Sequence, residues 1–241
     1  MATAPRSSVG RQVDYPTSDG KPMAETEIHR DLMLDLIKTL DAHFAADPMV
    51  CVSGNLMMFY EEGNKRKHIS PDVFVVRGIP KKLREYYLTW LEGKGPDLAI
   101  ELTSKSTRSE DVKKKKFLYR DVLKIPEYFL FDPLQDYLKP PMQGLRLVDG
   151  EYEPIDPING RLPSEVLGLH LERSGSQLRL YDPQTGQWLP TSAERIEAER
   201  DRAEAERDRA EAERQRADQA EAENARLRRE LEEFRRRQAE G

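Results

Sequence analysis

The chain has 241 residues, which is enough for one globular domain of roughly 190 residues and an appendage. Up to residue 192 it carries 26 basic and 28 acidic side chains, a balance that argues against strong sequence-independent binding to nucleic acid but leaves room for a local basic groove. The single cysteine, Cys51, excludes an internal disulfide and fits a reducing cytosol. No apolar run is long enough to span a bilayer, so we expect a cytoplasmic protein without membrane contact.

The first 14 residues are small, polar and unpatterned, which predicts a disordered N-terminus before a globular domain over residues 15–190. An apolar stripe predicts a helix over residues 24–45. Glu25 and His29 stand four residues apart in line with that stripe, so both side chains are expected inward or at the edge of the core. Two interpretations remain open: a helix-capping acid with a hydrogen-bonded interior histidine, or two side chains that support a metal site.

Two connecting segments have no strong periodicity. Residues 50–62 are typical of one strand with a bulge, followed by a hairpin tip and a basic cluster just before Asp72, formed by Lys65, Arg66 and Lys67. This cluster fits a solvated loop and a phosphate contact equally well. Residues 79–95 predict a short helix, and its inward positions, spaced by four, are Leu83, Tyr87 and Leu91.

Three short apolar runs predict buried strands at residues 73–76, 98–100 and 128–131. Buried strands rarely carry charge, yet Asp72 opens the first run and Glu101 follows the second. Two carboxylates on adjacent strands are suitable ligands for a hard divalent cation, Mg²⁺ or Mn²⁺, that activates a water.

A helix predicted over residues 109–124 places Lys115 in the middle of an apolar face. At 100° per residue the other members of that face are Val112, Leu118, Tyr119, Val122 and Leu123. A lysine in such a stripe either extends its ammonium to solvent or meets a buried carboxylate, and Glu101 is the nearest candidate along the chain. Tyr119 fits core packing or a hydrogen bond into the same site. Ser109, Glu110 and Asp111 make a good helix start, with acids in the first turn. Lys105 and Arg108 in the loop before it are candidate phosphate contacts.

Short strands that extend or cover the sheet are predicted at residues 145–148, 151–155 and 178–181. Asp149-Gly150 between the first two is a strong hairpin signal. Asp132, which ends the run at residues 128–131, is interpreted as a turn residue in Asp-Pro.

Residues 193–241 form a charged near-heptad repeat, which predicts a long helix. One register places Ile196, Ala203, Ala210, Ala217, Asn224 and Leu231 at position a, with Ala220, Leu227 and Phe234 at position d. The glutamates Glu199, Glu206 and Glu213 also fall at d and weaken the first half. We expect a coiled-coil homodimer anchored near residues 227–234, with a single charge-stabilised helix as the alternative.

The segments SPDVFVV, PDLAIELTSKST and KKKKFLYRDVLKIPEYFLFDP resemble the Uma-two family of restriction-endonuclease-like proteins, within the PD-(D/E)XK nuclease superfamily. The resemblance covers residues 15–189. It implies an α/β (α+β) restriction-endonuclease-like core, with a mixed β-sheet flanked by helices, extra hairpins and a long C-terminal helix. It also implies a Mg²⁺-dependent nuclease in which Asp72 and Glu101 hold the metal and Glu25 assists. The superfamily pattern E-x-K puts lysine where Thr103 stands, and the resemblance suggests that Lys115 on the next helix replaces it.

The patterns and the family resemblance together leave three functions open. The first is a metal-dependent endonuclease acting on nucleic acid, with DNA favoured, in which Asp72, Glu101, Lys115 and Glu25 are catalytic and His29, Thr103 and Tyr119 support them. The second is a catalytically inactive binding or scaffold protein with the same fold that oligomerises through its C-terminal helix, an alternative that Thr103 favours. The third is a structural ion pair between Lys115 and Glu101 in an ordinary α/β domain.

Overall fold

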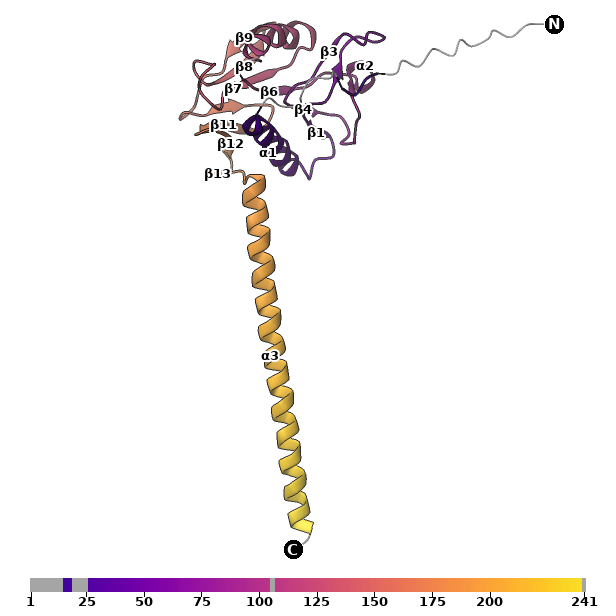
Figure 1. Ribbon diagram of the computed structural model, residues 1–241, viewed down its shortest axis with the longest axis vertical. Coiled ribbons are helices and arrows are strands. Elements are labelled where there is room, and N and C mark those ends of the chain that lie inside the picture. Colours follow the sequence, from indigo (N-terminus) through magenta and orange to yellow (C-terminus); the bar gives the residue numbers. More distant parts are fainter. Residues whose placement is uncertain (1–14, 19–25, 105–106, 240–241) are drawn as a thin grey trace, which may run out of the picture. The chain divides into compact units, whose positions relative to one another are not determined.

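The computed structural model describes residues 15–18, 26–104 and 107–239. The N-terminal 14 residues that we expect to be disordered, together with Glu25 and Lys105, lie outside the described residues. The chain divides into two compact units, Met1–Thr191 and Ser192–Gly241 (Figure 1). Within the described residues, no helix is both long enough and apolar enough to cross a membrane.

A six-stranded sheet forms the centre of the first unit, in the order β1-β4-β6-β7-β8-β9 (Figure 1). Its strands are β1 (Val50–Ser53), β4 (Val73–Arg77), β6 (Leu98–Leu102), β7 (Glu127–Phe131), β8 (Met142–Val148) and β9 (Glu151–Pro154). Strands β6 and β7 are parallel and the other neighbours are antiparallel. The expected α/β class with a mixed sheet is therefore confirmed. The hairpin predicted at Asp149-Gly150 is also present, with positive φ angles of 49° and 88°.

Apolar side chains cover both faces of this sheet. On one face, α1 (Glu27–His43) packs with alternate residues of the strands, such as Leu98 and Ile100 of β6. On the other face lie two π-helical segments, η1 (Glu110–Lys115) and η2 (Leu118–Val122), which belong to the crossover between the parallel strands (Figure 1). Because side chains alternate along a strand, Ala99 and Glu101 face these segments. The sheet alternation thus directs a carboxylate into the second core.

Two smaller sheets flank the central one. One contains β2 (Met58–Phe59), β3 (His68–Ile69) and β5 (Tyr87–Leu88), which is followed by α2 (Thr89–Glu92). The other contains β10 (Leu162–Ser164), β11 (Leu169–Ser174), β12 (Gln177–Asp182) and β13 (Gln187–Trp188).

The sequence-based interpretation of residues 50–95 is wrong in two places. Residues 50–62 form β1 and β2, which belong to different sheets, rather than one strand. The helix expected at residues 79–95 is reduced to α2, and Leu83 and Leu91 are exposed while Tyr87 is buried in β5. Tyr87 is in a strand because it pairs in parallel with Met58. This contact is far along the chain, so the spacing of apolar residues in a predicted helix cannot reveal it.

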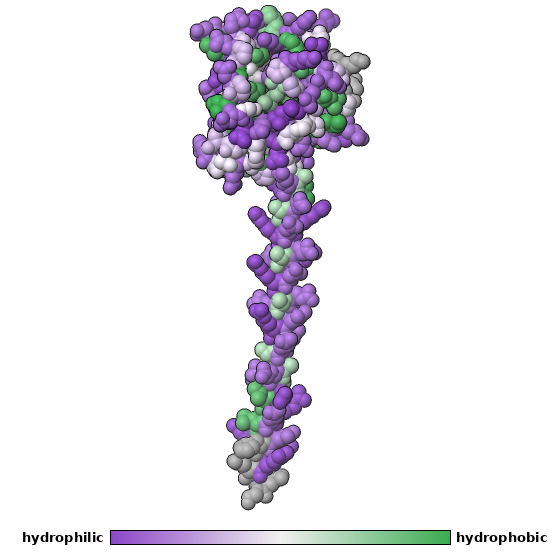
Figure 2. Space-filling model, turned by 90° about the vertical axis from the view of Figure 1, so that its left-hand side faces the viewer, coloured by the Kyte–Doolittle hydropathy of each residue, from purple (hydrophilic) through white to green (hydrophobic). Residues whose placement is uncertain are grey.

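The C-terminal unit is a single helix, α3 (Ser192–Ala239), whose described residues are almost all exposed. Figure 2 shows that its surface is mainly hydrophilic, with isolated apolar patches. Its glutamates and arginines are spaced for pairing along one helix, such as Arg226 with Glu230 at 2.8 Å.

The close approach of Gly54 to the backbone of Asp72 can be tested by substitution. A Cβ atom at position 54 would lie 2.0 Å from the carbonyl oxygen of Asp72 and 2.6 Å from Cδ1 of Ile37. We expect Gly54→Ala to lower the free energy of unfolding by about 3 kcal/mol, measured by urea denaturation. The matched control is Gly150→Ala, which has φ +88° but no atom within 4 Å; only the left-handed strain of about 1 kcal/mol should appear there. Equal losses in both variants would contradict this account of Gly54.

A second test concerns the fork between Arg84 and Glu92, whose two hydrogen bonds are both 2.9 Å long. The hydrogen bond from Arg84 lowers the pKa of Glu92 from 4.5 to about 2. Because the folded-state pKa is lowered, the stabilisation is present above pH 4.5 and is lost as the pH falls through about 2. We expect Glu92→Gln to reduce stability by about 1 to 2 kcal/mol at neutral pH, and by less as the solution is acidified between these values. The control is Glu85→Gln at an exposed position outside the fork, which should leave the free energy of unfolding at neutral pH unchanged. A difference in stability between wild type and Glu92→Gln that stays constant with pH would contradict the role of the fork.

Candidate functional site

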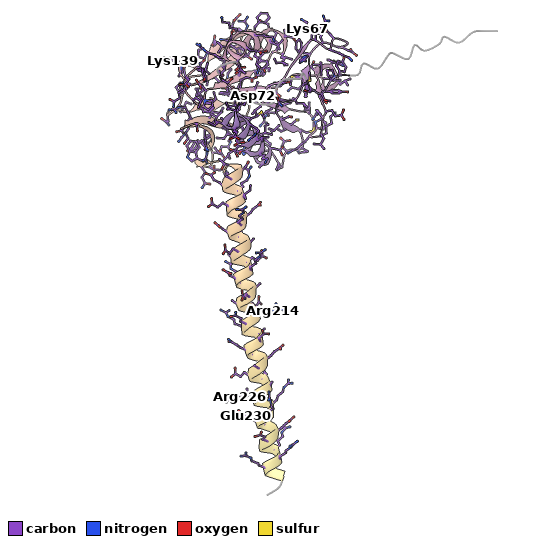
Figure 3. The ribbon with its side chains drawn as sticks, in the orientation of Figure 1. Lys67, Asp72, Lys139, Arg214, Arg226 and Glu230 are labelled. Carbon is purple, nitrogen blue, oxygen red and sulfur yellow. The ribbon has the colours of Figure 1, made fainter. Side chains whose placement is uncertain are left out.

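Asp72 lies immediately before β4, at the point where this strand meets β6 (Figure 3). The pairing of Val73 with Ile100 puts Asp72 opposite Glu101. Its Oδ2 atom accepts a hydrogen bond of 2.8 Å from the backbone N–H of Leu102 and lies 3.2 Å from Nε2 of His29 on α1. The side chain is 14% exposed, so Asp72 lies at the border between the protein interior and solvent.

Glu101 is fully buried in β6, and both of its carboxylate oxygens have donors. Oε2 accepts from Nζ of Lys115 at 2.6 Å and from the backbone N–H of Asp72 at 3.4 Å. Oε1 accepts from the hydroxyl of Tyr119 at 2.5 Å. The structure thus brings Asp72, Glu101, Lys115 and Tyr119 together from two strands and one helical crossover.

The helical crossover presents Lys115 and Tyr119 inward, but the apolar face expected around them is only partly correct. Leu118 and Tyr119 are buried, whereas Val112 and Val122 are exposed by 36% and 48%. The reason is local geometry, because η1 and η2 have i→i+5 hydrogen bonds and therefore more residues per turn than the 100° spacing assumes.

Asp111 is also a member of this cluster. The sequence interpretation assigned it only to the start of the helix. It is 1% exposed, and its Oδ1 lies 3.2 Å from Nζ of Lys115. Neither of its carboxylate oxygens has a hydrogen-bond partner within the described residues. The i,i+4 spacing of Asp111 and Lys115 was the available signal, but such pairs are normally found on exposed helix surfaces.

The cluster contains three carboxylates and one ammonium in a buried setting. Burial raises the pKa of Glu101 well above its ordinary value, and the charges of Asp72 and Asp111 add to this effect. Burial also raises the pKa of Asp111. Burial alone would raise the pKa of Asp72, but the hydrogen bond with His29 and the charge of Lys115 lower it below the ordinary value. The raised pKa values of Glu101 and Asp111 mean that their charged forms are disfavoured unless a further cation lies nearby.

Lys115 remains protonated in this environment. Burial by itself would lower the pKa of its ammonium, yet the three neighbouring carboxylates outweigh that effect and raise the pKa above the ordinary value. A permanently charged Lys115 can attract a phosphate oxygen but cannot act as a general base near neutral pH.

The other residues predicted from the sequence are placed as follows. Thr103 is 2% exposed; its backbone N–H bonds to Phe131, and its hydroxyl has no hydrogen-bond partner within the described residues. Arg108 is exposed and lines a cavity of about 540 Å³ together with Tyr137 and Lys139. Thr103 is therefore buried directly after β6, the strand that carries Glu101, whereas Arg108 lies on the surface.

The basic cluster Lys65, Arg66 and Lys67 occupies the exposed turn between β2 and β3. Figure 3 shows Lys67 toward the edge of the first unit, away from Asp72. Among the hydrogen bonds and ion pairs of the described residues, none joins these three cations to Asp72, Glu101 or Asp111. The structure does not bring them into the cluster.

The donor set suits a hard divalent cation. In the described ranges, no three His, Cys, Asp or Glu side chains are arranged to hold a metal ion between them. Mg²⁺ does not require such a cage, because it usually keeps several waters and uses one or two carboxylates plus substrate phosphate. Asp72 and Glu101 are adjacent oxygen donors in a cluster of three carboxylates around one ammonium, and Asp111 has two oxygens without a hydrogen-bond partner among the described residues, so the residues present fit this ion.

The chain is similar to one family of known proteins and to a solved structure. None of the curated proteins compared matches the chain. Among solved structures, it is similar to one titled "a putative nuclease belonging to DUF820 from Anabaena variabilis ATCC 29413", with 18% identity, a TM-score of 0.47, and coverage of 63% of this chain and 80% of that chain. The Uma2 family, described as "Putative restriction endonuclease", matches residues 6–206. Since this match spans most of the chain, the protein belongs to the Uma2 family.

Proposed function

We propose that this chain is a metal-dependent endonuclease that hydrolyses phosphodiester bonds in nucleic acid, with DNA as the favoured substrate. The observation that carries the proposal is the convergence of Asp72, Glu101 and Lys115 from β4, β6 and η1. Family membership supports a nuclease in general, and the description as a restriction endonuclease favours DNA.

Asp72 and Glu101 are the residues that would hold Mg²⁺ or Mn²⁺. When bound, such a cation supplies a Lewis acid for the phosphate and lowers the pKa of a coordinated water. Asp72 is the partly exposed member of the pair and therefore the one nearest to substrate. The role of His29 is to fix the orientation of the Asp72 carboxylate, as a partner behind a metal ligand usually does.

Lys115 supplies fixed positive charge. Its ammonium is held between Glu101 at 2.6 Å and Asp111 at 3.2 Å, so it is oriented before substrate arrives. A preorganised cation stabilises negative charge that develops on the phosphate in the transition state. Tyr119 keeps Glu101 in place from the opposite oxygen. Lysine at this position on the crossover thus takes the role that the superfamily assigns to the position of Thr103.

Contacts with the nucleic-acid backbone are proposed on the surface near η1. Arg108 and Lys139 are exposed cations that line one cavity with Tyr137, a combination that suits phosphate and base contacts. Lys65, Arg66 and Lys67 remain candidates for a more distant backbone contact, which their exposure permits.

A second candidate is a nuclease-fold protein that binds but does not cleave and that assembles as a homo-oligomer through α3. Two observations favour it: threonine occupies position 103, and both oxygens of Glu101 already have protein donors. The two candidates differ in whether a divalent ion binds and in whether phosphodiester bonds are cut.

Substitution of Asp72 and of Lys115 tests whether this cluster cleaves nucleic acid. We expect Asp72→Asn and Lys115→Met to reduce Mg²⁺-dependent cleavage of DNA by about 100-fold or more, because the first weakens a ligand of the metal and the second removes the cation that stabilises the reacting phosphate. The control is Lys114→Met, which changes the exposed neighbour that pairs with Glu110 at 2.9 Å; its cleavage rate should match wild type. Circular dichroism establishes that the variants are folded. Equal cleavage by wild type, Asp72→Asn and Lys115→Met would refute the nuclease assignment to this cluster.

Metal binding is tested separately by thermal unfolding. A free metal concentration about ten times Kd stabilises the folded state by about 1.4 kcal/mol, or about 3 to 6 °C for a domain of this size. We expect Mg²⁺ or Mn²⁺ to produce this shift in wild type and in Lys114→Met but not in Asp72→Asn. No shift in any of the three at millimolar metal would favour the non-cleaving candidate.

A further inference from the structure

The helix α3 has apolar side chains that nothing within its own unit covers. Ile196, Leu227 and Leu231 are each exposed by about half, at 51%, 54% and 51%. Apart from the start of the helix, Figure 2 shows the most strongly hydrophobic residues toward its C-terminal end. A helix that exposes leucines four residues apart has a stripe suited to a partner helix.

The heptad register divides α3 into two halves of different character. In the second half, positions a and d are apolar or small apart from one asparagine: Ala217, Ala220, Asn224, Leu227, Leu231 and Phe234. In the first half, position d is always glutamate, at Glu199, Glu206 and Glu213. Only the second half therefore has the seam that a coiled coil requires.

The charges that flank this seam indicate the orientation of the partner. In a parallel, in-register pair, position g of one helix lies beside position e of the next heptad in the other helix. For the second half these pairs are Arg216 with Glu221, Glu223 with Arg228, and Glu230 with Arg235, and all are opposite in charge. For the first half they are Arg202 with Arg207 and Arg209 with Arg214, and both repel.

An antiparallel pair is disfavoured by the same residues. It brings position g beside g and e beside e. Glu223 would then approach Glu230 of the other copy twice by symmetry, across a seam centred near Leu227. Charge complementarity and apolar character thus coincide in one segment and in one orientation.

We propose that residues 216–237 form a parallel, in-register, two-stranded coiled coil with a second copy of this chain, and that residues 196–214 remain an unpaired helical spacer. Asn224 at position a fixes the register and the two-stranded state. In the single chain its Nδ2 donates to the carbonyl oxygen of Ala220 at 2.9 Å, and in the pair it faces the same residue of the second copy. Glu230 is already oriented along the helix by Arg226, one turn earlier (Figure 3). The pairing goes beyond the proposed cleavage and does not depend on it.

Sedimentation of the full chain tests association. We expect a concentration-dependent species of twice the 27.8 kDa chain mass. Glu223→Arg/Glu230→Arg should raise the dimer Kd about tenfold or more, since four attractive pairs become repulsive. Arg228→Glu/Arg235→Glu should weaken its own dimer likewise, whereas a mixture of the two variants should restore pairing. A chain that stays monomeric near millimolar concentration, or variants that pair as wild type does, would overturn the proposal.

Disulfide trapping tests the orientation. Ala217→Cys places a thiol at position a, where the two copies meet in a parallel pair, and should oxidise to a covalent dimer at low concentration. Ala222→Cys, at the outward position f of the same helix, is the matched control and should not. The native Cys51 is buried and stays in both proteins. A dimer in which Ala217→Cys crosslinks no faster than Ala222→Cys would exclude the parallel register while leaving the nuclease proposal untouched.

Discussion

The first unit depends on the neutralisation of one buried carboxylate, that of Glu101 in the middle of the central sheet. A carboxylate with no solvent exposure is strongly destabilising unless charges and donors surround it. Lys115 and Tyr119 supply these from the crossover helix, and the backbone of Asp72 supplies another from the neighbouring strand. The same contacts determine where the crossover packs on the sheet, so local structure and candidate chemistry have a common cause.

A second buried acid shows what a purely structural carboxylate looks like in this fold. Glu127, one strand away in β7, accepts hydrogen bonds from Ser164, from the backbone of Glu165 and from Arg146. These donors tie the sheet of β10–β13 to the central sheet. Around Glu101, by contrast, two further acids lie near a single lysine, and among the described residues Asp111 has an ion pair with Lys115 but no hydrogen-bond partner for either oxygen. Three carboxyl groups around one lysine, rather than burial alone, distinguish the candidate site.

The two units have separate physical tasks. The first buries charge in a core, whereas α3 exposes nearly all of its residues and pairs charges along its own surface. A dimer that forms only through the last heptads of α3 would carry two copies of the candidate site and would change neither of them. Cleavage and assembly can thus be measured independently of each other.

The sequence by itself determined the buried strands at residues 73–76, 98–100 and 128–131, because short apolar runs bounded by turn residues have few alternatives. It also singled out Asp72, Glu101 and Lys115, because charge is rare in such runs and on the apolar face of a helix. It also determined the heptads of α3, whose pattern is local. Only the tertiary structure decided that Asp111 joins the cluster, that Val112 and Val122 face solvent, and that Tyr87 lies in a strand rather than a helix. These three findings depend on π-helical turns or on a strand partner that is distant along the chain. Neither feature leaves a periodic signal in the sequence, so sequence patterns could not predict them.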